Sequence, residues 1–253
     1  MGTQLDDGDT IIAGSATTDT LSATVNGLTA TTGALSISGV ETIQLDTATA
    51  ASTINAAGIV GASTIAVGSA QSVTLTNLEA GTNLQLGVTG SLDYSTQAVL
   101  TASLADATGS NDAITVTLSD TASDGDISAS LVIAGVETVT LADAESAGTG
   151  NNKNISVAGV AATTLNVTGG TASEVLSLVT DGSTGSQLLN AATTTVDASG
   201  FAGVLTASAA TNTATTFTAK TTVGTLTGGA SGDTFTIGST ANFLNASVGT
   251  VAG

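Results

Sequence analysis

The chain has 253 residues with no Cys, His, Trp or Pro, and its 2 Lys or Arg residues face 20 Asp or Glu, for a formal net charge of −18. Two cations cannot neutralise a nucleic-acid backbone, and a negative chain is repelled by anionic lipid surfaces. Without Cys or His there is no zinc finger, thiol nucleophile or serine–histidine triad, and 9% charged residues with a mean hydropathy of +0.41 are atypical of disorder.

The first segment is acidic. Asp6, Asp7 and Asp9 stand where a secretory signal would carry Lys or Arg, so this start is not such a signal. Ca²⁺ binds carboxylate and carbonyl oxygens, which makes the three residues candidate calcium ligands. The alternative is a turn in which Asp bonds its own backbone. No later stretch reaches 18 apolar residues, so we expect no membrane insertion.

Short segments in which aliphatic and small polar residues alternate follow one another along the chain. This two-residue period places aliphatic side chains on one face of a strand and Thr, Asn or Gln on the other. The segment 171–180 (TASEVLSLVT) fits either a short helix or a strand. The clearest alternating segments are 84–86, 114–118, 139–141, 165–167 and 235–237.

One internal repeat is clear. Residues 37–45 (ISGVETIQL) match residues 133–141 (IAGVETVTL), within repeat units around 33–47 and 131–143. Imperfect repeats with small corner residues indicate a β-solenoid, whose thin core suits a chain with 2% aromatic residues better than a β-sandwich does. Glu41 and Glu137, at matched positions, are expected to serve a rung corner or a contact between molecules.

We therefore predict one elongated all-β domain over residues 1–253, a β-solenoid of the parallel β-helix or β-roll type with rungs of roughly 20 residues. The C-terminal residues carry no recognisable end signal, so we expect the chain to be a fragment of a longer one.

Four Asp residues precede a hydrophobic strand residue at i+2 in a Gly/Ser/Thr setting: Asp9, Asp19, Asp112 and Asp233. The fullest case, residues 228–236 (GGASGDTFT), resembles the RTX calcium nonapeptide, with Ser231 in place of one Gly. Asp19, Asp112 and Asp233 thereby join the candidate calcium ligands. A second acidic cluster, Asp120, Asp124 and Asp126, lacks EF-hand spacing and fits a solvated loop or a calcium loop.

Together with 196–206, the repeated Gly-Val-Glu-Thr units and the Thr/Ala/Gly/Ser composition, this turn makes the chain resemble RTX-type surface-layer proteins of Gram-negative bacteria. The resemblance implies type I secretion, an extracellular location on the cell surface, and Ca²⁺-dependent self-assembly into a lattice, with cell-surface polysaccharide as a further partner.

An RTX-type adhesin or a fibre module is the alternative function, since both use Thr/Gly-rich β rods. We do not expect an enzyme, because carboxylate pairs that cleave polysaccharides are usually accompanied by aromatic, Arg or His side chains, which are scarce here. Ice binding needs a regular Thr array, and the Thr-dense segment 211–227 shows no fixed rung period.

Overall fold

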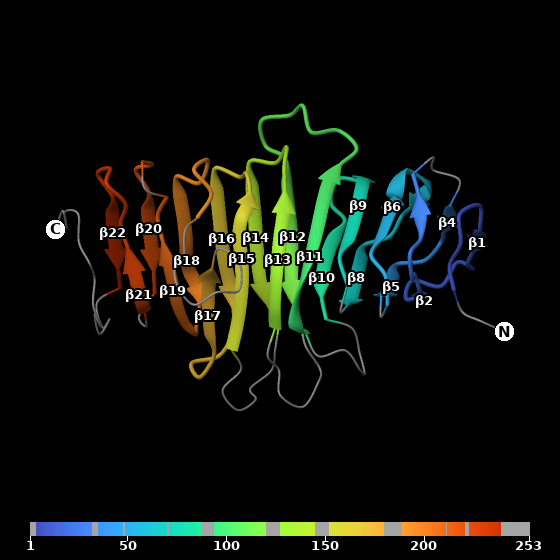
Figure 1. The fold of residues 1–253 in the computed structure, drawn as a ribbon, viewed down its shortest axis with the longest axis horizontal. Helices are drawn as coiled ribbons and strands as arrows, with labels where there is room; N and C mark the ends of the chain where they lie inside the picture. The colour runs from blue at the N-terminus through green and yellow to red at the C-terminus, as the bar shows by residue number, and fades with distance from the viewer. Residues whose placement is uncertain are drawn as a thin grey trace.

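The computed structural model describes residues 4–31, 35–47, 49–69, 71–87, 94–119, 127–144, 152–179, 189–210, 212–220 and 223–238. It confirms the all-β solenoid: parallel strands stack along one long axis, and β1 and β22 lie at opposite ends of the stack (Figure 1). The 3-10 turn η1 (Ala56–Gly58) is the one helical element of the described residues. No helix in these ranges is long and apolar enough to cross a membrane.

The chain alternates between two long parallel sheets, with a short third sheet at the N-terminal end. The ten-stranded sheet contains β2 (Thr20–Thr24), β5 (Thr42–Thr47), β8 (Thr64–Ser69), β10 (Asn83–Leu86), β12 (Ala113–Leu118), β14 (Thr138–Asp143), β16 (Thr164–Gly169), β18 (Thr195–Phe201), β20 (Thr216–Ala219) and β22 (Thr234–Ile237). The nine-stranded sheet contains β3 (Thr29–Ala30), β6 (Ser52–Asn55), β9 (Val73–Leu78), β11 (Tyr94–Leu104), β13 (Ile127–Ile133), β15 (Asn152–Val160), β17 (Val175–Val179), β19 (Val204–Ser208) and β21 (Val223–Thr227). The three-stranded sheet contains β1 (Thr10–Ile12), β4 (Ser36–Ser38) and β7 (Ile59–Val60).

The core lies between the two long sheets and follows from the alternation in the sequence. In β12 and β14 every second residue is buried, while the residues between them are partly exposed. Parallel pairing in register stacks the buried residues into columns that run along the rod. One such column holds Ile43, Ile65, Leu84, Val116, Leu141 and Val167, all at most 1% exposed.

The internal repeat corresponds to the same place on two rungs. Val40 and Val136 are both buried, and Gly39 and Gly135 both have positive φ, at 70° and 73°. Glycine reaches that backbone region at little cost, which explains its place in the turn before the strand. Matched sequences therefore make matched corners.

Rung length varies more than we expected. Phe235 stacks on Phe217 after 18 residues, whereas Val116 stacks on Leu84 after 32. Loops of different length leave the strand register intact, so the stack holds fewer rungs than a constant length of roughly 20 residues predicts. The ambiguous segment 171–180 contains strand β17 and no helix among its described residues.

Candidate functional site

The outer face of the ten-stranded sheet carries a column of threonines that we call the threonine ladder. Its members occupy the same register on five consecutive strands, and each is at least partly exposed: Thr138, Thr164, Thr195, Thr216 and Thr234. Neighbouring members are one strand spacing apart, about 4.8 Å. Thr has a high strand propensity, so the ladder fits the fold as well as any function.

A second polar column runs beside the ladder, two residues further along each strand. It consists of Thr140, Asn166, Asp197, Thr218 and Thr236. The hydroxyl, amide and carboxylate groups of the two columns form a two-dimensional array on one face. Such an array can meet another repeating surface through many weak hydrogen bonds.

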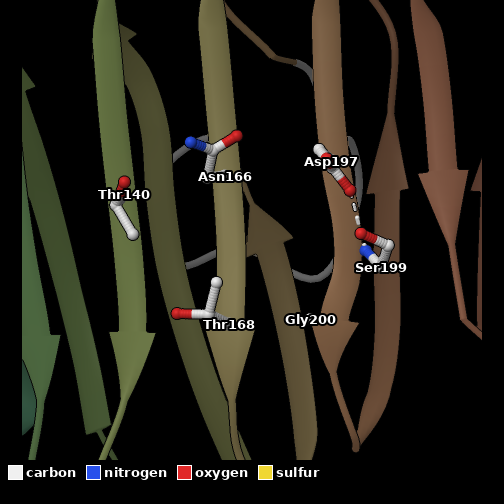
Figure 2. A pocket seen from close by; sticks show the side chains of 6 residues that line it. All are labelled: Thr140, Asn166, Thr168, Asp197, Ser199 and Gly200. Carbon is white, nitrogen blue, oxygen red and sulfur yellow. Dashed lines mark hydrogen bonds between the residues drawn. The ribbon is translucent and has the colours of Figure 1, made fainter.

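A shallow groove of about 320 Å³ interrupts this face (Figure 2). It lies at the one register shift among the pairings of the ten-stranded sheet, where β18 has an extra residue between Asp197 and Gly200 relative to β16. The backbone N–H of Ser199 donates to Oδ1 of Asp197 at 2.9 Å, which closes the bulge. The groove is lined by Thr140, Asn166, Thr168, Asp197, Ser199 and Gly200.

Corner residues precede the strands of the ten-stranded sheet and bond back to the rung before them. Oε2 of Glu41 accepts from the backbone N–H of Asp19, and Oε2 of Glu137 accepts from the backbone N–H of Asp112, both at 2.8 Å. A carboxylate suits a corner N–H because a charge-assisted hydrogen bond is stronger than a neutral one. The predicted corner role of Glu41 and Glu137 is confirmed.

Asp233 holds the equivalent corner position before β22. It is 4% exposed, and its Oδ1 accepts from the backbone N–H of Thr215 at 2.8 Å. The Oδ2 atoms of Asp19, Asp112 and Asp233 are buried and have no hydrogen-bond partner among the described residues. A buried carboxylate oxygen is costly unless a donor or a cation meets it. These three residues therefore keep an oxygen that fits a hard cation such as Ca²⁺.

The predicted ligands do not gather into one site. Asp6, Asp7 and Asp9 lie in a turn where the Asp6 N–H donates to Oδ2 of Asp9 at 2.9 Å, and Asp6 and Asp7 are exposed. In the part of the chain that the structure describes, no group of three or more Asp or Glu side chains could hold a metal ion. A cation there would need backbone carbonyls or water as its other ligands. The cluster Asp120, Asp124 and Asp126 lies outside the described residues.

Sequence reasoning missed a buried ion cluster, defined here as Lys153, Asp143 and Glu174 and called the Lys153 cluster. Nζ of Lys153 lies 3.0 Å from Oδ2 of Asp143 and 3.8 Å from Oε1 of Glu174. The Lys153 and Glu174 side chains are fully buried, and that of Asp143 is 1% exposed. Lys153 is one of only two cations in the chain, so its rarity was the available signal.

Burial raises the pKa of Glu174 above its usual value, and the charge of Asp143 acts in the same direction. The backbone N–H of Thr171, which donates to Oε2 of Glu174 at 2.5 Å, and the ammonium of Lys153 oppose that rise. The net direction is upward, which favours the neutral acid form of Glu174.

Comparisons of the chain with family models, curated proteins and solved structures found no match.

Proposed function

We propose that this protein is a structural component of a bacterial surface coat that self-assembles outside the cell. The observation that carries the proposal is the regular polar face of the ten-stranded sheet, with the threonine ladder in unbroken vertical register. A face that repeats at each strand can meet the same face of a neighbouring rod at many equivalent points. The elongated stack in Figure 1 is the shape that such side-by-side contacts need.

Charge supports a role for a cation in the assembly. The chain has a formal net charge of −18, and one of its two Lys residues is buried in the Lys153 cluster. Rods with this charge repel one another unless counter-ions screen them. The buried Oδ2 atoms of Asp19, Asp112 and Asp233 are the most suitable attachment points in the described residues. We therefore propose Ca²⁺ as the cofactor of assembly, with type I secretion as the route of export.

Negative-stain electron microscopy of the purified chain, with millimolar Ca²⁺ or with a chelator, tests both parts. We expect sheets or ordered fibres in calcium and dispersed rods in chelator. Order in both conditions would remove calcium from the proposal and keep the assembly. Dispersed rods in both conditions would contradict self-assembly and favour an adhesin or fibre module that binds a host or carbohydrate surface as a monomer.

A pair of charge-matched variants tests the face. Thr195→Lys/Thr216→Lys places two cations on adjacent members of the threonine ladder. The control, Thr53→Lys/Thr74→Lys, adds the same charge on adjacent strands of the nine-stranded sheet, at positions of similar partial exposure to Thr195. We expect the ladder variant alone to lose assembly, while circular dichroism shows both to be folded. Equal assembly by the two variants would show that another face makes the contact.

The ligands are best tested with Asp→Asn changes. Because Oδ1 of Asp233 accepts the Thr215 N–H, Asp233→Ala would also remove a corner hydrogen bond. Asp233→Asn keeps an acceptor at the corner and removes the charge. We expect it to raise the calcium concentration needed for assembly without lowering the unfolding temperature. Asn substitutions of Asp6, Asp7 and Asp9 should act in the same way, because Asp6 and Asp7 are exposed and Asp9→Asn keeps an acceptor for the Asp6 N–H.

The threonine ladder also favours a second candidate, ice binding. The variable rung length hides the ladder in the sequence, since its members are 26, 31, 21 and 18 residues apart. An ordered hydroxyl array could hold water in a repeating layer. Thermal hysteresis of the freezing point, abolished by Thr195→Lys/Thr216→Lys and kept by the control, would support this candidate. A freezing point equal to that of the buffer would exclude it.

A further inference from the structure

Two members of the Lys153 cluster, Lys153 and Asp143, lie in line with buried aliphatic residues of neighbouring rungs. Lys153 stands between Ile127 and Leu176 in its column of the nine-stranded sheet. Asp143 follows Leu118 in its column of the ten-stranded sheet. These aliphatic neighbours are buried, as are Lys153 and Asp143 themselves, so an amine and a carboxyl group meet in the interior, away from solvent.

We propose that Lys153 and Asp143 condense in the folded protein to form an intramolecular isopeptide bond, with Glu174 as the proton relay. The inference stands independently of the surface-coat function. It assigns a covalent modification to a chain whose lack of Cys rules out disulfides.

The first support is geometric. Nζ of Lys153 lies 3.0 Å from a carboxyl oxygen of Asp143, so the carbon that would be attacked is one bond beyond an atom already in contact. Reacting groups held at about 3 to 3.5 Å gain a large rate advantage over the same groups free in solution. The strands that carry them, β14 and β15, are successive in the chain and are each fixed by parallel partners on both sides.

The second support is the buried, water-excluding surroundings of the two side chains. An ammonium and a carboxylate do not react with each other, so the step begins with transfer of the Lys153 proton to Asp143 across their 3.0 Å contact, which leaves a neutral amine and a neutral acid. The buried surroundings lack the water that stabilises separated charges. Only the neutral amine has the lone pair that attacks carbon. Exclusion of bulk water also favours condensation over hydrolysis.

The third support is the position of Glu174, the third member of the cluster. Oε1 of Glu174 lies 3.8 Å from Nζ, and Oε2 is anchored by the Thr171 N–H, so the carboxyl group is held beside the reacting atoms. Burial raises the pKa of Glu174, and a carboxyl group with a raised pKa that is held beside the reacting atoms is suited to general acid–base work.

The lone pair of the neutral Lys153 amine attacks Cγ of the protonated Asp143, and the Nζ–Cγ bond forms. Glu174 gives its proton to the departing hydroxyl oxygen and receives the proton that Nζ releases. The Cγ–O bond breaks and one water molecule leaves. Glu174 ends in its starting form, and no oxidant or external reactant is needed.

The wild-type chain itself provides the test. Its two Lys residues, with no Arg, are its only trypsin sites, and Lys220 is exposed. Trypsin needs a cationic side chain, so an acylated Lys153 resists cleavage even in denatured protein. We expect two tryptic fragments from the denatured chain and an intact mass lower than the sequence mass by one water molecule. Three fragments together with the full mass, after the folded protein has been held in neutral buffer, would overturn the proposal.

Three variants assign the roles. Lys153→Met and Asp143→Ala should both show their own full sequence mass, and Asp143→Ala should be cut at Lys153. Glu174→Gln keeps the size of the side chain, so a folded variant that now shows full mass and cleavage at Lys153 identifies the relay. A Glu174→Gln variant that cross-links as fast as wild type would remove Glu174 from the mechanism. Tandem mass spectrometry that places the amide on Glu174 would overturn the assignment to Asp143. Cleavage at Lys220 is the internal control in every sample.

Discussion

The two long sheets of the solenoid differ in regularity, although they share the same chain and the same core. The ten-stranded sheet contains a single register shift, between β16 and β18. The nine-stranded sheet contains four, in the pairings β9–β11, β11–β13, β13–β15 and β19–β21. Three of these shifts displace the pairing by one residue, and the shift between β11 and β13 displaces it by two. Such shifts interrupt the outward columns of the nine-stranded sheet, so the more regular sheet is the better carrier of a continuous array.

This difference shows which of the two sheets accommodates extra residues within its strands. Register shifts in β15 and β21 involve strands that contain a glycine packed closely against the neighbouring strand: Gly159 against the Leu131 carbonyl and Gly224 against the Thr206 hydroxyl. In the ten-stranded sheet, β5, β14 and β22 instead begin directly after a corner carboxylate, Glu41, Glu137 or Asp233, that bonds back to the rung before. A corner fixed in this way restores the register before the next strand starts. Substitutions in the two sheets can test that contrast.

Matched core truncations should give the largest effect. Leu141 lies in the regular column, and Leu131 lies at a register shift; both are 0% exposed. We expect Leu→Ala at either position to lower the free energy of unfolding by about 2 to 5 kcal/mol, with Leu141 at the upper end because a regular column collapses less easily around a cavity. Urea titration measures both. A larger loss at Leu131 would mean that the bulged sheet is the stiffer one.

The next largest effect is expected from Gly→Ala substitutions at two bulges, one in each long sheet, and the two losses of stability should differ. An added Cβ at Gly159 would lie 2.7 Å from the carbonyl oxygen of Leu131, whereas at Gly200 the nearest atom is a Thr168 methyl carbon at 3.1 Å. We expect Gly159→Ala to cost about 1 to 3 kcal/mol, as for an overpacked core. Gly200→Ala should cost less than about 1 kcal/mol. Equal denaturation midpoints for the two variants would contradict the close backbone approach.

Removal of a corner carboxylate should give an intermediate effect. Glu137→Ala leaves the part-buried Asp112 N–H without its acceptor, which should cost about 1 to 3 kcal/mol. Glu137→Gln keeps an acceptor oxygen and is expected to recover most of that loss. Thermal unfolding of the two variants decides the point, and equal losses would show that the charge and not the hydrogen bond matters. Glu41→Ala and Glu41→Gln should repeat the result, because Glu41 makes the same contact.

The smallest expected effect is the pH dependence of folding stability that comes from Asp46. Burial raises the pKa of Asp46, on β5, above the usual value for an Asp side chain. The folded state therefore holds this proton more tightly than the unfolded state. Its stabilising contribution is present below the unfolded pKa and is lost as pH rises through the higher folded pKa. Asp46→Asn should be more stable than wild type at neutral pH, by less than about 1 kcal/mol, and should lose that advantage in acid. Unfolding midpoints measured across acid and neutral pH check the sign.

Part of the candidate site could be predicted from particular residues. The repeat GVET placed Glu41 and Glu137 at equivalent corners, and Asp19, Asp112 and Asp233 were found as turn residues whose carboxylates lie beside the strand starts. Whether they bind calcium remains a prediction. The groove beside Asp197 and the pairing of Lys153 with Asp143 could not be predicted, because each depends on how two rungs align.

The class of fold follows from the amino-acid sequence alone. Alternation of aliphatic residues with Thr dictates strands with one buried face, and scarce aromatic residues with variable small-residue turns favour a thin solenoid core. Only the tertiary structure decided which residues stack. Rungs of 18 to 32 residues hide the columns in the linear sequence, and the threonine ladder and the Lys153 cluster arise only once parallel pairing has set the register. The physical reason is that strand pairing aligns residues by hydrogen-bond position and not by distance along the chain, so loops of any length can separate two neighbours in a column.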